Sequence, residues 1–309
     1  MLYTVNIYRG EQIESKHLVR VTNSVSSEGF GLYLRSSFKP FQLLPFVADG
    51  GFDKLKLEER LLAIFSSSHS SEEIHIRTLR EVLKNHEIDE ENLYCNPHWP
   101  LNEDYSREMS TKGINPQKIH NNCSGKHTAM LLMCKYFGFT YENYWSIDHP
   151  LQRWLLDFLS NLFSSKLNNI GIDGCGAPIP YLNSKTIVDT ANKLIMEDND
   201  VARSWTRIIN SMKLNPYLVA GTGRFDSLLM ERSNNKLVAK VGAEGVIFLH
   251  SKEDTLVIKS NDGTRRGADL IAAHYARERG LISSDLFEIE KDIIYNKQKQ
   301  QVGYIEIYK

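Results

Sequence analysis

A serine and a lysine stand three residues apart at a predicted helix start, in the segment Arg35-Ser36-Ser37-Phe38-Lys39-Pro40-Phe41-Gln42. Three positions along a helix bring two side chains to one face, so the Lys39 amine could accept the Ser36 proton without a histidine. The lysine pKa must then fall by about two units or more to give a neutral base near pH 7. Because the spacing is common on protein surfaces, its meaning depends on the rest of the chain.

Two further segments supply groups of the same chemistry. Ser68-His69-Ser70 lies in a region predicted to be helical, and Lys240-Val241-Gly242 lies on a late predicted strand. This order, with SxxK first, is that of serine β-lactamases and penicillin-binding proteins. If Lys39 and Lys240 share one pocket, repulsion and burial favour the neutral amine on at least one of them. Alternatively, Ser68 caps the next helix and Lys240 is an exposed strand lysine.

A second polar group surrounds two of the four cysteines. Residues 121–127 read NNCSGKH and contain Cys123 and Lys126, and a glycine-rich segment, 171–178, contains Asp173 and Cys175. These side chains could form a metal site or a polar substrate pocket; alternatively, both thiols are small buried hydrophobic groups. The chain has no CxxC or HExxH motif, so spacing alone does not specify zinc.

The predicted elements place strands at both ends of the chain, at 3–8, 18–22, 31–34, 237–241, 245–250, 255–259 and 302–308. Helices dominate the middle. This order predicts an α+β (α/β) fold in which an antiparallel sheet is built from both chain ends, with packed helices and an inserted helical lobe. We expect one catalytic unit over 1–309, with the sheet in about 1–50 and 215–309 and the helical lobe in about 51–214. The glycine-rich segment 171–178 is expected to contain no regular element.

Composition excludes several classes of protein. The chain has 309 residues, 41% of them hydrophobic, which supports a substantial core. A net charge of −1 without basic clusters argues against a nucleic-acid partner. No apolar run approaches the roughly 20 residues that span a membrane. The first residues alternate like a strand rather than forming a signal peptide, so we expect a cytoplasmic protein with reduced thiols.

Taken together, these segments resemble those of the Rhizobium etli-type L-asparaginases, the asparaginase II family. The matching segments occur in one order over nearly the whole chain: Arg35-Ser36 with Lys39-Pro40-Phe41-Gln42, Ser68-His69, residues 121–127, residues 171–176, Gly223-Arg224-Phe225-Asp226, and Lys240 with Gly242-Ala243-Glu244-Gly245. Ser71 and Ala129 stand where the family pattern has glycine. The resemblance implies a fold similar to serine β-lactamases and glutaminases, hydrolysis of L-asparagine to aspartate and ammonia, and a homodimer.

The resemblance also implies site residues. It assigns catalysis to two serine and lysine pairs, Ser36 with Lys39 and Ser68 with Lys240. Either serine could be the nucleophile. We favour Ser36 because its helix start also offers backbone N–H groups to an oxyanion.

In the same family a zinc ion is bound by two cysteines and a lysine, which correspond to Cys123, Cys175 and Lys126. Arg35 and Asp173 are candidates to bind the α-carboxylate and α-ammonium of the substrate, or else are structural. The alternative functions are a glutaminase or β-lactamase-like serine hydrolase, and a non-catalytic zinc-stabilised binding protein.

Overall fold

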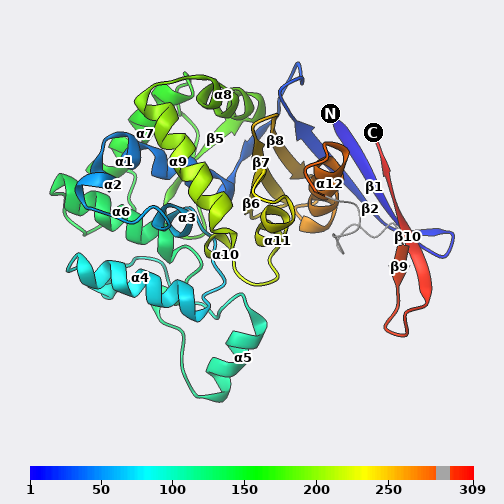
Figure 1. Ribbon diagram of the computed structural model, residues 1–309, viewed down its shortest axis with the longest axis horizontal. Coiled ribbons are helices and arrows are strands. Elements are labelled where there is room, and N and C mark those ends of the chain that lie inside the picture. The colour runs from blue at the N-terminus through cyan, green and yellow to red at the C-terminus, as the bar shows by residue number, and fades with distance from the viewer. Residues whose placement is uncertain (283–292) are drawn as a thin grey trace.

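A seven-stranded antiparallel sheet is built from both ends of the chain (Figure 1). The computed structural model describes residues 1–282 and 293–309. Within these residues the strand order is β6-β7-β8-β2-β1-β10-β9, and every pairing is antiparallel. The α+β class and the sheet made from both termini are therefore confirmed.

The strands are β1 (Leu2–Arg9), β2 (Gln12–Thr22), β3 (Gly31–Tyr33), β4 (Ile170–Ile172), β5 (Pro178–Asn183), β6 (Leu237–Gly242), β7 (Val246–Ser251), β8 (Thr255–Ser260), β9 (Ile293–Tyr295) and β10 (Gln301–Tyr308). The helices are α1 (Lys39–Ala48), α2 (Gly51–Lys54), α3 (Leu61–Phe65), α4 (Glu73–Asn85), α5 (Glu103–Thr111), α6 (Ser124–Phe137), α7 (Pro150–Leu162), α8 (Ser184–Met196), α9 (Asp200–Leu214), α10 (Pro216–Val219), α11 (Phe225–Arg232) and α12 (Arg265–Glu278). Three short 3-10 helices are η1 (Arg35–Phe38), η2 (Glu90–Asn92) and η3 (Lys118–His120).

Strands β6 and β7 are buried along their whole length. Apart from Lys240 in β6 and His250 and Ser251 in β7, they consist of apolar residues and glycine, because helices pack on this half of the sheet. Helix α12 packs against β2, β7 and β8, whereas α8 packs against β8 and α9 against β6. The N- and C-terminal strands lie at the opposite side of the sheet, next to each other (Figure 1).

An aromatic cluster joins the helical region to the buried face of the sheet. The Phe41 ring on α1 stacks on Trp205 of α9, with 4.6 Å between ring centroids, and meets Phe248 of β7 edge-on at 5.6 Å. All three side chains are fully buried or nearly so. Contacts of this kind fix the direction of α1 relative to β6 and β7, and so fix where α1 begins.

The expectation that 171–178 lacks regular structure is wrong at both ends of that segment. Gly171 and Ile172 belong to β4, and Pro178 begins β5; the two strands pair with Gly171 opposite Ile179. Glycine is compatible with a strand when a neighbouring side chain needs the space, and here the Tyr33 ring lies over Gly171. Strand β3, predicted at 31–34, pairs with β5 in this second sheet rather than with the main one.

Across residues 1–282 and 293–309, none of the helices combines the length and the apolar character required to cross a bilayer.

Candidate active site

The Ser36 turn lies between β3 and α1 and is held against strand β6. Arg35 has a left-handed backbone (φ 54°), which reverses the chain immediately before Ser36. Pro40, in the first turn, favours the start of α1 because its missing N–H has no helical partner there. The Ser37 hydroxyl donates a hydrogen bond to the Lys240 carbonyl at 2.7 Å. This bond brings the predicted nucleophile to the strand that carries the second lysine.

Both catalytic lysine candidates converge on the Ser68 hydroxyl. Lys39 Nζ lies 3.0 Å from Ser68 Oγ, and Lys240 Nζ lies 3.1 Å from the same oxygen. Lys39 also donates to the Ser67 carbonyl, and Lys240 donates to the Val241 carbonyl at 2.8 Å. Because a hydroxyl can both donate and accept, a proton can pass through Ser68 between the two amines.

The predicted contact between Ser36 and Lys39 takes a different form. The Lys39 amine points to the segment 67–68, and Ser36 is joined to Lys39 only through the backbone, where the Lys39 N–H donates to the Ser36 carbonyl. The Ser36 side chain is partly exposed, whereas Ser68 is buried. Ser36 can therefore meet a molecule from solvent, whereas Ser68 lies buried between the two lysines.

The structural alternatives for Ser68 and Lys240 do not hold. Helix α4 begins at Glu73 with Glu72 in the N-cap position, so Ser68 does not cap it. Lys240 has no exposed side-chain surface. A fully buried lysine is costly and needs polar partners, which Ser68 and Asp226 provide here.

The electrostatic environment of Lys240 suits a base. Burial and the positive charge of Lys39 together lower the pKa of Lys240 to about 8, against the opposing attraction of Asp226. A neutral Lys240 amine is therefore accessible near neutral pH. The expectation that at least one lysine would lose its proton easily is met at Lys240.

The two cysteines and Lys126 form a second buried group. Lys126 Nζ donates to Cys175 Sγ at 2.8 Å, and the two thiols share a side-chain hydrogen bond. This bond from Cys123, with the Lys126 charge, holds the pKa of Cys175 well below its usual range, whereas the same bond and burial raise the pKa of Cys123. Burial alone would lower the pKa of Lys126, but Cys175, Cys123 and Asp173 raise it overall.

These three side chains fit a zinc ion by donor type and placement. In the described parts of the chain, no cluster of three or more His, Cys, Asp or Glu side chains could hold a metal. The candidate set instead contains two soft sulfur donors and one amine, already in contact and buried. Cysteines that served only as small hydrophobic groups would not need the Lys126 amine beside them.

Arg35 and Asp173 are brought together, with 2.6 Å between Arg35 Nε and Asp173 Oδ1. Asp173 begins the tight loop that carries Cys175, in which its N–H donates to the Ala177 carbonyl at 2.9 Å. The ion pair thus joins the Ser36 turn to the Cys175 loop. A small void of about 10 Å³ is lined by Lys39 and Lys126, together with mostly apolar side chains.

Two functional candidates were missed by sequence reasoning. Asp226 lies 3.5 Å from Lys240 Nζ, and its motif was noted only as part of the family pattern. Glu72 accepts hydrogen bonds from Tyr217 and from the Thr222 backbone and hydroxyl, which ties the segment after Ser68 to the chain before α11. No spacing rule pairs residues so far apart in sequence, and the only signal was an acidic residue near a candidate serine.

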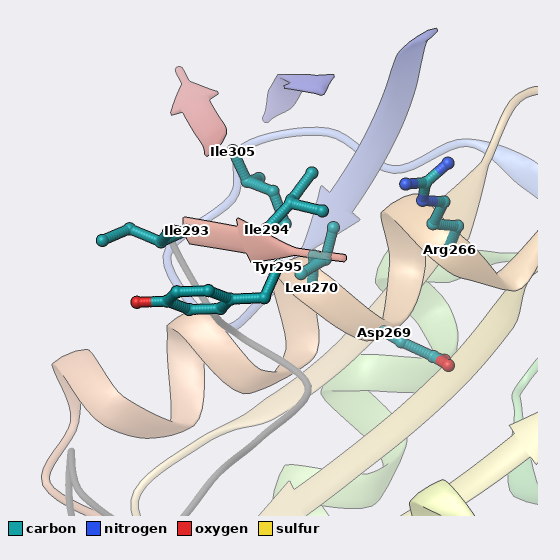
Figure 2. Close-up of a pocket in the computed structure, with 7 residues that line it drawn as sticks. All are labelled: Arg266, Asp269, Leu270, Ile293, Ile294, Tyr295 and Ile305. Atoms are coloured by element: carbon teal, nitrogen blue, oxygen red, sulfur yellow. The ribbon is translucent and has the colours of Figure 1, made fainter. Parts of the chain in front are cut away.

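A larger cavity elsewhere does not contain the site. It has a volume of about 370 Å³ and lies between α12 and the β9–β10 hairpin, lined by Arg266, Asp269, Leu270, Ile293, Ile294, Tyr295 and Ile305 (Figure 2). None of the predicted catalytic or metal-binding residues lines it. The candidate site therefore rests on the chemistry of its side chains and not on cavity size.

The chain is similar to known proteins over most of its length. A search of curated proteins finds no match. Among solved structures, the chain is similar to a protein from Bacteroides dorei DSM 17855 described as a "putative beta-lactamase", at 9% identity and a TM-score of 0.39, covering 84% of each chain. The family model described as L-asparaginase II matches residues 5–307, which include every candidate site residue. The chain therefore belongs to the L-asparaginase II family, a family of amidohydrolases.

Proposed function

We propose that the protein hydrolyses L-asparagine to L-aspartate and ammonia through a serine–lysine mechanism. The observation that carries the proposal is the contact sequence Lys39–Ser68–Lys240, with 3.0 and 3.1 Å between the nitrogens and the shared oxygen. Family membership supports the amide substrate. A non-catalytic binding protein would have no use for two buried lysines on one serine hydroxyl.

In the proposed reaction, Ser36 Oγ attacks the side-chain amide carbon of asparagine. The hydroxyl proton passes to Lys39 and, through Ser68, can be shared with Lys240. Collapse of the tetrahedral intermediate breaks the C–N bond, and the leaving nitrogen takes a proton from the lysine pair and departs as ammonia. Water then attacks the Ser36 ester and gives a proton to the same pair. The acyl C–O bond to Ser36 breaks, aspartate is released, and the Ser36 oxygen takes that proton back.

Two substitutions test the catalytic assignment. Ser36→Ala removes the nucleophile and Lys39→Met removes the adjacent amine, so each is expected to reduce ammonia release by at least about 10⁴-fold without unfolding the protein. Ser211→Ala and Lys213→Met are matched controls, because these buried side chains lie on α9 outside the site. Turnover that survives in either active-site variant contradicts the assignment.

The substrate is tested in the same assay. Ammonia release is measured with L-asparagine, L-glutamine and β-aspartyl peptides. Glutamine differs from asparagine by one methylene, which is worth about 1 to 3 kcal/mol of discrimination, so we expect a preference for asparagine of roughly 10- to 200-fold. A preference for glutamine would replace the proposal with a glutaminase on the same site.

We also propose that Cys123, Cys175 and Lys126 bind zinc. When bound, zinc would supply a Lewis acid beside the substrate pocket. Lysine ligates only as the neutral amine, so metal binding must release the Lys126 proton. On the protein side, the Arg35–Asp173 ion pair joins the Cys175 loop to the Ser36 turn. The remaining N–H groups of Arg35 would bind and orient the substrate carboxylate.

Elemental analysis tests the zinc proposal. Cys123→Ser and Cys175→Ser are each expected to lose the metal and to raise KM for asparagine more than they lower kcat. Cys134→Ser, which removes a buried thiol on α6 away from Lys126, is the control and should keep the metal. Full zinc occupancy in both site variants would refute the proposal.

The homodimer and the cytoplasmic location expected from the sequence are proposals of the same kind. Light scattering on the purified protein tests the first, with a mass of twice 35.5 kDa expected. Fractionation of the producing cells tests the second.

A further inference from the structure

The least expected feature near the site is a buried carboxylate behind Lys240. Asp226 lies in the first turn of α11 and its side chain is 1% exposed. Asp226 Oδ2 accepts a hydrogen bond from the Val241 N–H at 3.1 Å and lies 3.5 Å from Lys240 Nζ. Asp226 Oδ1 has no hydrogen-bond partner among the described residues.

A buried carboxylate that has one oxygen without a hydrogen bond is not expected to stabilise the fold. Burial raises the pKa of Asp226, but the charges of Lys240 and Arg224 and the Val241 N–H lower it overall, so the group is ionised. Buried ion pairs commonly contribute less to stability than apolar side chains of similar size. The position of Asp226 therefore points to a role toward Lys240.

We propose that Asp226 is a positioning residue, which holds the Lys240 amine on the Ser68 hydroxyl by binding both the Lys240 side chain and the backbone of its strand. This inference rests on the proposed function, in which Lys240 exchanges protons through Ser68. Asp226 contacts two successive residues of β6: it forms an ion pair with the Lys240 side chain and accepts a hydrogen bond from the Val241 N–H. Since α11 packs on β6, the carboxylate is itself fixed by the fold.

The groups that act on Lys240 come from several elements. Asp226 and Arg224 belong to the start of α11, Lys39 to α1, and Cys123 to the residue before α6; the partner on β7 is the uncharged Phe248. Asp226 is the nearest negative charge and opposes the repulsion from Lys39. Without it, Lys240 would lose its proton more easily and would also lose one of its three polar contacts.

The substitution Asp226→Asn separates this role from a purely structural one. Asn keeps the size of the side chain and an acceptor for the Val241 N–H, but it removes the charge. Lys240 acts as a neutral base, so activity falls as pH drops below its pKa. The acid limb of the kcat profile should therefore move to lower pH by roughly 1 to 3 units in the variant, the range expected for loss of an adjacent opposite charge.

The effect on the position of Lys240 is measured separately, from kcat and KM at the new pH optimum. Because Asp226 is proposed to act through Lys240, kcat should fall about tenfold or more, while KM stays within about threefold. Asp226→Ala should lower kcat further. Asp254→Asn is the matched control: Asp254 is also buried, accepts backbone N–H bonds and faces a cation, Arg279, but it lies away from the site. It should leave the acid limb in place.

A measurement without substrate makes the failure of this inference distinguishable from failure of the proposed function. In protein labelled with [¹³Cε]lysine, the signal absent from Lys240→Met belongs to Lys240, and its titration gives the Lys240 pKa directly. A lower pKa in Asp226→Asn supports the inference even if asparagine is not the substrate. An unchanged Lys240 titration in folded Asp226→Asn overturns it, whatever the activity.

Discussion

At the scale of single residues, Ser68 is the group that links the two lysines of the candidate site. Its hydroxyl lies within hydrogen-bond distance of both Lys39 and Lys240. A buried hydroxyl between two amines is suited to proton transfer, whereas the partly exposed Ser36 is suited to attack on a substrate. The two serines thus have different roles because their surroundings differ.

Ser68→Ala tests this division. The substitution leaves both lysines in place but removes the path between them, so kcat for ammonia release should fall by about 10² to 10⁴-fold, the usual contribution of a positioned proton-transfer group. The enzyme should still form a small amount of acyl-enzyme, which Ser36→Ala cannot form; intact-protein mass spectrometry after rapid quenching distinguishes them.

Ser70→Ala is the matched control, because the Ser70 hydroxyl is also buried but donates to the Ala220 carbonyl at 2.7 Å. If kcat falls equally in Ser70→Ala and Ser68→Ala, the segment that contains both serines contributes to activity through its packing and not through proton transfer by the Ser68 hydroxyl.

The sequence identifies Ser36, Lys39, Ser68 and Lys240 as candidates from residue type and order, because each side chain keeps its chemistry in any fold. It does not show how these side chains meet. Their contacts depend on side-chain direction: Lys39 extends along the segment 67–68 instead of back toward Ser36. Asp226 could not be assigned from sequence, since nothing local shows that its carboxylate faces β6.

At the scale of elements, the site depends on the close approach of η1 to β6. A side chain at Gly242 would place its Cβ 2.5 Å from the Leu34 carbonyl oxygen and 3.0 Å from the Ser37 hydroxyl. A Cβ so close to the Leu34 carbonyl oxygen would push the two backbone segments apart. Glycine at position 242 is therefore required for η1 to pack closely on β6. Sequence alone suggested a lysine followed by glycine, and the structure supplies the physical reason.

Gly242→Ala should therefore separate η1 from β6. A displacement of the order of 1 Å between Ser36 and the lysines can cost about 10²-fold in rate, so kcat/KM should fall by about that factor, with a loss of about 1 to 3 kcal/mol in the free energy of unfolding. Activity assays and urea titrations measure the two effects.

Gly138→Ala controls for backbone strain without crowding. Gly138 has a left-handed backbone (φ 72°) at the end of α6, and nothing lies within 4 Å of the position a Cβ would take. This variant should lose about 1 kcal/mol of stability and no activity once folded. If Gly242→Ala and Gly138→Ala lose activity equally, separation of η1 from β6 is not the cause of the loss.

The segment after Ser68 shows how elements far apart in sequence combine. Ser71 has a left-handed backbone (φ 61°) where the family pattern has glycine, and its hydroxyl donates to the His120 carbonyl. Glu72 then binds Tyr217 and Thr222. These contacts compensate for the strain at Ser71, and they were not predictable because the partners lie about 50 and 150 residues further along the chain.

At the scale of the whole molecule, catalysis and closure of the sheet occupy opposite edges. The order β6-β7-β8-β2-β1-β10-β9 puts Lys240 on one edge strand and the pairing of the two chain ends near the other. Strands from both ends were predictable from alternating residues, but their order was not, because only long-range packing decides which strands are neighbours. The arrangement lets stability and activity be changed separately.

Ile7→Ala tests that separation. Ile7 on β1 is fully buried and lies opposite Ile305 of β10, so its truncation leaves a cavity and should cost about 2 to 5 kcal/mol in the free energy of unfolding. At 25 °C, where most molecules should remain folded, kcat/KM should stay within about twofold of the wild-type value, because β2, β8 and β7 lie between β1 and the strand that carries Lys240. Ile13→Ala, on an exposed side chain of β2, should change neither quantity. A large fall in kcat/KM for folded Ile7→Ala would mean that the sheet transmits the distortion across its width, and that the position of Lys240 depends on pairing of the two chain ends as well as on its contacts with Asp226 and Ser68.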